Sequence, residues 1–178
     1  DDDYFGFGGS HAAVIKADGS GTIEHPINSG FGEDNPKWAM DGKLLTWANN
    51  REGRRSLAFQ GNREVDIYGA FLDQAAYDQF KLSKEDFALL KEKSATEKKD
   101  SSSKKWSPDF NDLENRKLRL TINSSSISDY AISPDGSKIY YLASFEKGYD
   151  LWVTDPRTRE TKILAKLGGS PSGIEMSK

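Results

Sequence analysis

The sequence predicts an all-β chain made of four-stranded antiparallel units, interrupted by one small helical insertion. Two observations carry this prediction. An apolar run, an Asp-Gly pair and a second apolar run occur together twice, over 36–48 and 130–142. The end of one unit and the start of the next are separated by 11 residues at three places, from Ile27 to Trp38, from Leu120 to Ala131 and from Leu164 to Glu175.

Each Asp-Gly pair predicts a hairpin, because glycine accepts the positive φ that a tight turn between two strands requires. The pairs are Asp41-Gly42 and Asp135-Gly136. In both units an aromatic and β-branched run follows the hairpin, and a further run closes the unit. These runs lie at 65–68 and 117–121 in the first unit, and at 150–153 and 161–165 in the second.

Repetition of four-stranded units is the architecture of a β-propeller, so we expect the whole chain, 1–178, to be a partial propeller. We assign 11–27 to the end of a preceding blade and 172–178 to the start of a following one. Between them we expect a blade over 36–122, which contains the helical insertion at 73–115, and a second blade over 128–167.

Within the insertion the apolar period changes from that of a strand to that of a helix. Ser83 with Asp86 three residues later resembles a capping box, and Asp73 is placed to cap a shorter helix before it. The stretch 91–105 contains six lysines, three acids and no aromatic residue. Such a segment buries too little apolar surface to offset its ordering entropy, so we expect most of it to be a loop.

Composition excludes several classes of protein. The 178 residues include no run of 18 apolar residues, so no membrane span is expected. The absence of cysteine excludes a disulfide scaffold and a thiolate site, and a net charge of −3 gives no electrostatic case for binding nucleic acid. Because the chain begins with three aspartates and no methionine, we expect it to be a segment of a longer protein.

No catalytic, metal or cofactor site is predicted. The two histidines, His11 and His25, are not spaced as metal ligands, and no Gly-x-Ser-x-Gly nucleophile elbow occurs. The glycine-rich stretch 6–11 lacks the lysine of a phosphate-binding loop. Aromatic residues of the strands, such as Trp47 and Trp152, are expected to fill the space between blades.

Five stretches together resemble the propeller of tricorn-like serine proteases: Trp-Ala-Met-Asp-Gly-Lys at 38–43, Asn-Arg-Glu-Gly at 50–53, Asp-Ile-Tyr at 66–68, Asp-Leu-Glu-Asn-Arg-Lys-Leu-Arg-Leu-Thr at 112–121 and Ile-Ser-Pro-Asp-Gly at 132–136. In that family the propellers precede a PDZ-like domain and the catalytic domains. The resemblance therefore implies a non-catalytic propeller segment of a serine-type peptidase, part of a channel or scaffold that admits and presents peptides. It also implies downstream PDZ-like and protease domains as partners. It favours a cytoplasmic location, with a periplasmic or exported one as the alternative.

Two alternatives stay open because propellers of other kinds share the Ser-Pro-Asp-Gly motif. The first is a TolB-like propeller that binds proteins and has no attached hydrolase. The second is the propeller of a prolyl-oligopeptidase-like enzyme. In either case the terminal blades of a propeller fragment leave open edges and faces, so we expect the isolated chain to self-associate.

One pair of residues is a candidate for substrate binding. Arg54 and Arg55 are the only adjacent arginines in the chain. A guanidinium group binds a carboxylate in a bidentate manner, through two parallel hydrogen bonds. Tricorn-like proteases hold the C-terminal carboxylate of a peptide with adjacent arginines of a propeller, so the resemblance implies this role for Arg54 and Arg55. The alternative is an ion pair with a nearby acid such as Glu52 or Glu64.

Overall fold

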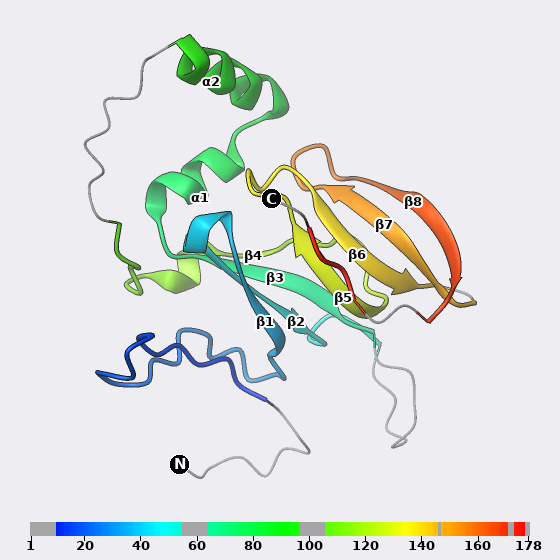
Figure 1. Cartoon of the computed structure of the whole chain (residues 1–178), viewed down its shortest axis with the longest axis horizontal. Coiled ribbons are helices and arrows are strands. Elements are labelled where there is room, and N and C mark those ends of the chain that lie inside the picture. Colours follow the sequence, from blue (N-terminus) through cyan, green and yellow to red (C-terminus); the bar gives the residue numbers. More distant parts are fainter. Residues whose placement is uncertain (1–9, 55–63, 97–105, 146, 171–172, 177–178) are drawn as a thin grey trace.

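Two four-stranded antiparallel sheets form the chain, and each follows the order of the sequence (Figure 1). The computed structural model describes residues 10–54, 64–96, 106–145, 147–170 and 173–176. The first sheet contains β1 (Asp34–Ala39), β2 (Leu44–Asn49), β3 (Asp66–Phe71) and β4 (Lys117–Arg119). The second contains β5 (Ser126–Ile132), β6 (Ile139–Ser144), β7 (Tyr149–Asp155) and β8 (Glu160–Gly169). This arrangement is that of two neighbouring propeller blades and confirms the predicted fold class.

The two predicted Asp-Gly turns connect the first two strands of each sheet. Asp41 and Gly42 have φ of 54° and 83° within a short 3₁₀ turn, η1 (Met40–Gly42). In the second sheet Gly136 has φ of 68°, and a Cβ there would lie 2.8 Å from the sulfur of Met40. The backbone angle therefore favours glycine at 136, whereas the flexible end of the Met40 side chain can move to make room for a Cβ.

The main core lies between the two sheets. It combines Leu44, Ile67 and Phe71 of the first sheet with Tyr130 and Tyr141 of the second. The opposite face of the first sheet is also covered, since Leu45, Trp47 and Ala70 pack against Ala12 and Ile27 of the N-terminal segment. As a result β2 is buried along its whole length.

The N-terminal segment before β1 is held by a buried acid rather than by a sheet. Glu33 is 1% exposed, and its carboxylate accepts hydrogen bonds from the amides of Ala12 and Ser29. One isolated antiparallel bridge joins Val14 to Glu24. The assignments of 11–27 to a preceding blade and of 172–178 to a following blade stay predictions.

The insertion contains the two predicted helices, α1 (Gln74–Lys81) and α2 (Lys84–Thr96). Both predicted caps form: Asp73 accepts from the amide of Ala76 at 2.7 Å, and Ser83 accepts from the amide of Asp86 at 3.1 Å. In the stretch 91–105, most of which is expected to be a loop, α2 continues through 91–96. Lysine and glutamate are good helix formers, so this stretch extends a capped helix. Residues 97–105 lie outside the described part of the chain, and a 3₁₀ turn, η2 (Leu113–Arg116), precedes β4.

The insertion contacts the neighbouring blade. The Phe80 ring packs on Phe71 of its own blade with centroids 4.9 Å apart. Arg157, from the turn between β7 and β8, lies 3.7 Å over the Phe87 ring and donates a hydrogen bond to the Gln79 carbonyl. Lys91 pairs with Asp135 of the β5–β6 turn at 2.7 Å. The helices therefore bridge the two sheets at one end of the molecule (Figure 1).

A polar junction joins the sheets at their first strands. Asp129 of β5 accepts hydrogen bonds from the side chains of Asn35 and Lys37 of β1. It also accepts one from the amide of Ile174, in the C-terminal segment beside β5 (Figure 1). Burial raises the pKa of Asp129, but these hydrogen bonds outweigh it and lower the pKa to about 2. The carboxylate is therefore ionised at neutral pH.

We predict that Asp129→Asn destabilises the chain in a pH-dependent way. The folded-state pKa lies below the unfolded value near 4, so the ionised carboxylate stabilises the fold above about pH 4. This contribution is lost as the pH falls from about 4 to about 2. We expect a loss of about 2 kcal/mol at pH 7 in urea unfolding, and a smaller difference from the wild type at pH 3.

The matched control is Asp41→Asn. Asp41 is exposed, and asparagine also tolerates its left-handed backbone. Equal losses for the two variants at pH 7, or a loss at Asp129 that does not shrink in acid, would contradict the role of the junction.

Candidate binding site

A small polar cavity of about 280 Å³ lies on the face of the first sheet that packs against the N-terminal segment. Three residues in register across the sheet line it. Trp47 of β2 is opposite Tyr68 of β3, and Tyr68 is opposite Arg119 of β4, so all three side chains lie on one face. The remaining lining residues are Asn28, Ser29, Asn49, Arg51, Glu114, Lys117 and Leu118.

The aromatic part of the cavity contains a buried donor without a partner. Trp47 is 2% exposed, and its ring stacks on Tyr68 with centroids 6.0 Å apart. Among the described residues, the indole Nε1 of Trp47 has no hydrogen-bond partner. A buried unpaired donor costs about 1–3 kcal/mol.

Cations dominate the rest of the lining. Arg51, Lys117 and Arg119 line the cavity, whereas Glu114 is its one acidic lining residue among those described. Lys117 and Arg119 are two residues apart on β4, so they project from the same face of the strand. The lining therefore carries more positive than negative charge.

Arg119 is fixed by a buried acid behind the cavity. Its Nη2 donates to Asp66 at 2.8 Å, and Asp66 is fully buried. The hydroxyls of Thr121 and Ser124 also donate to this carboxylate, each at 2.7 Å. The ion pair and the two hydroxyl bonds hold the guanidinium in place.

The other two cations have exposed partners. Lys117 pairs with Glu114, whose side chain is 79% exposed. Arg51 Nε lies 3.7 Å from Glu52, whose side chain is 53% exposed. Exposed ion pairs contribute little free energy, so an incoming anion competes readily with Glu114 for Lys117.

Tyr68 offers a further donor. Burial raises the pKa of the Tyr68 hydroxyl, and the charges of Asp66 and Glu52 raise it further. Arg119 and Arg51 oppose this effect and lower the pKa in part. The hydroxyl stays protonated at neutral pH and can donate a hydrogen bond.

Of the predicted substrate-binding pair, Arg54 and Arg55, the structure describes only Arg54. Arg54 donates from Nε and Nη2 to Glu64, at 2.9 and 2.6 Å, and its side chain is 89% exposed. This is the ion pair that sequence reasoning gave as the alternative. Arg55 lies outside the described residues, and the role of the pair in carboxylate binding stays a prediction.

Sequence reasoning missed Lys117 and Arg119. They lie about 70 residues after Trp47 in the chain, beyond the insertion, and only the pairing of β3 with β4 brings them to the cavity. The available signal was two basic residues at alternate positions of a predicted strand, which places them on one face.

Other chemistry is sparse in the part of the chain that the structure describes. It contains no group of three or more His, Cys, Asp or Glu side chains arranged to hold a metal ion. His11 lies 3.8 Å from the carboxylate of Glu33 and 45% of its side chain is exposed. No helix within these residues is long and apolar enough to cross a membrane.

Comparison with known proteins gives distant structural matches. No family model matches the chain, and no curated protein matches it. The chain is similar to TolB from Acinetobacter baumannii, with 15% identity and a TM-score of 0.48 over 92% of this chain and 27% of that one. It is also similar to the tricorn protease, with 15% identity and a TM-score of 0.47 over 86% of this chain and 15% of that one.

Its two sheets make the chain a propeller segment. The chain spans about a quarter or less of the length of the two solved structures it matches. The membership in a tricorn-like family that the sequence implies stays a prediction.

The cavity yields a stability prediction. Arg119→Ala removes the cation that neutralises the fully buried Asp66, while the two hydroxyl bonds to Asp66 remain. We expect a loss of about 2 kcal/mol in urea unfolding. Arg54→Ala serves as the control, because its ion pair with Glu64 is on the surface, and its unfolding midpoint should match that of the wild type. A wild-type midpoint for Arg119→Ala would show that Asp66 needs no counter-ion.

Proposed function

We propose that this chain is a non-catalytic propeller segment of a tricorn-like serine peptidase, which helps to admit and present peptides. Within it, the cavity beside Trp47 binds a carboxylate of the peptide. The three cations that line the cavity, Arg51, Lys117 and Arg119, carry this proposal, because among the described lining residues they face a single acid, Glu114. The motifs at 112–121 and 132–136 support the family assignment.

The size and polarity of the cavity suit a small anionic group. At about 280 Å³ the cavity is smaller than the usual pocket for a drug-sized ligand, so it suits a small group. Arginine side chains bind carboxylates with two parallel N–H donors, and Arg51 and Arg119 both line the cavity. The Trp47 indole and the Tyr68 hydroxyl add neutral donors.

We predict that the chain prefers peptides with a free C-terminus. Two peptides of one sequence, one ending in a carboxylate and the other in an amide, are titrated against the chain by calorimetry. We expect the carboxylate form to bind about tenfold more tightly at low ionic strength, a preference that decreases with added salt. Arg51→Gln combined with Lys117→Gln should abolish the preference.

The double variant Arg54→Gln with Arg55→Gln is the matched control, because it also removes two positive charges. Retention of the preference in this control assigns the carboxylate to the cavity. If the preference is lost only in this control, the carboxylate binds at the adjacent arginines instead. Equal affinities of the wild type for both peptides would overturn the carboxylate proposal.

The coding sequence beyond residue 178 tests the family assignment. Further blades followed by a PDZ-like region and a serine peptidase domain would support the peptidase. A sequence that completes the propeller and encodes no hydrolase would favour the TolB-like alternative.

A further inference from the structure

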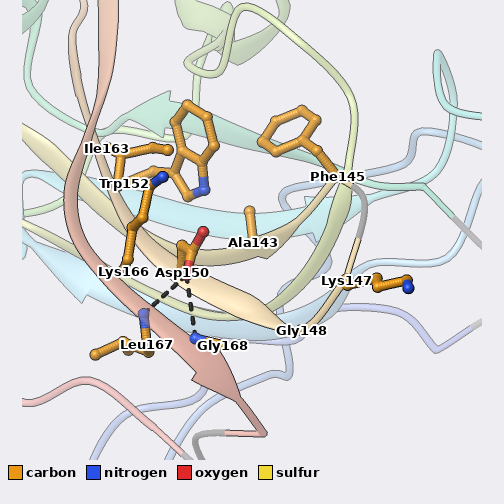
Figure 2. A pocket seen from close by; sticks show the side chains of 10 residues that line it. All are labelled: Ala143, Phe145, Lys147, Gly148, Asp150, Trp152, Ile163, Lys166, Leu167 and Gly168. Atoms are coloured by element: carbon orange, nitrogen blue, oxygen red, sulfur yellow. Dashed lines mark hydrogen bonds between the residues drawn. The ribbon is translucent and has the colours of Figure 1, made fainter.

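A second, larger hollow of about 950 Å³ lies on the second sheet (Figure 2). It is lined by residues at the end of β6, along β7 and at the end of β8. Ala143 is opposite Asp150 and Tyr141 is opposite Trp152, so Asp150 and Trp152 lie on the face that contributes to the core between the sheets. The hollow, which we call the β6–β8 hollow, is thus separate from the cavity on the first sheet.

One side of this hollow is apolar. Phe145 and Trp152 pack edge to face with centroids 4.7 Å apart. Phe145 is 45% exposed, and Ile163 and Leu167 are 38% and 51% exposed. An exposed apolar group of this kind in a concave surface is typical of a binding site for an apolar side chain.

The polar groups of the hollow include a donor and an acceptor. Trp152 Nε1 is buried and has no hydrogen-bond partner among the described residues. Asp150 Oδ1 accepts from the amides of Leu167 and Gly168, at 2.8 and 3.2 Å. Its other oxygen points away from these amides, toward the side of the hollow that holds the Trp152 ring (Figure 2).

This pair matches the chemistry of a peptide backbone. Asp150 and Trp152 are alternate residues of β7, so their Cα atoms lie about 7 Å apart on one face. An extended peptide presents carbonyl acceptors and N–H donors at a similar spacing. The indole N–H can donate to a carbonyl while the Asp150 carboxylate accepts from a nearby N–H.

Two lysines add charge at the hollow. Lys147 and Lys166 line it and are exposed, and within the described residues neither forms an ion pair. The acidic lining residue Asp150 is already bound to two backbone amides. The charge of the hollow therefore complements an acidic ligand.

We propose that the β6–β8 hollow binds an extended peptide segment in which an apolar side chain is flanked by acidic residues. The apolar side chain contacts Phe145 and Trp152, and the acidic residues pair with Lys147 and Lys166. A backbone carbonyl of the segment accepts from Trp152 Nε1. This inference deepens the proposed function, on which it rests for the class of ligand, a peptide.

The test uses a hexapeptide with one phenylalanine between two glutamates, acetylated at one end and amidated at the other. Its capped ends remove the C-terminal carboxylate, which the cavity beside Trp47 is proposed to bind. Calorimetry against the whole chain should show saturable binding. Replacing both glutamates by lysine, or the phenylalanine by alanine, should weaken binding by about tenfold or more.

Three variants locate the site. Lys147→Gln with Lys166→Gln should weaken binding of the hexapeptide about tenfold. Trp152→Phe keeps an aromatic ring but removes the N–H donor, and should weaken binding about fivefold without changing the unfolding midpoint greatly. Arg51→Gln with Lys117→Gln is the matched control of equal charge change, and its affinity should equal that of the wild type.

The binding results test whether the peptide occupies the β6–β8 hollow. No binding of the hexapeptide, or wild-type affinity in the Lys147 and Lys166 variant, would overturn the inference. Binding of the hexapeptide without a preference for free C-termini would leave this inference standing and remove the carboxylate cavity alone.

Discussion

The relative position of the two blades depends on a small polar junction between β1 and β5. Apolar packing between sheets is not directional, so it allows several offsets of one sheet against the other. The Tyr130 hydroxyl donates to the Asn35 carbonyl at 2.8 Å, and Lys37 Nζ donates to the Tyr130 carbonyl at 2.7 Å. These bonds require one offset, and the burial of Tyr130 makes any other offset costly.

The cavity beside Trp47 and the β6–β8 hollow are each lined by a tryptophan. An indole contributes a large apolar surface and a single N–H donor, so it packs well in a blade but leaves the donor to be paired. In the described residues the donors of Trp47 and Trp152 both remain unpaired beside lysine or arginine side chains. The two blades thus use the same combination of an aromatic wall, one donor and nearby cations on different faces.

Local signals in the sequence predict most of the fold. The Asp-Gly turns and the caps at Asp73 and Ser83 depend on a few neighbouring residues, and the structure confirms them. The end of α2 was less predictable, because a lysine-rich stretch suits either a loop or an exposed helix. The residues of the cavity beside Trp47 were harder to predict than the helix. Arg119 reaches the cavity only through the register of β4 on β3, which is set by packing across a long insertion. Arg54 and Glu64, in contrast, lie on the same connection, so their pairing follows from proximity in the chain.

The helical insertion has a consequence for how the blades unfold. In repeat architectures each unit is stabilised mainly by its neighbour, and the units can open one at a time. Here a segment that leaves the first blade after β3 packs against two turns of the second blade, through Arg157 and Asp135, and then returns to form β4. Loss of the second blade would therefore expose Phe87 and remove the contacts of α2 with Arg157 and Asp135. The insertion couples the two blades into one cooperative unit, whose parts gain or lose their structure together.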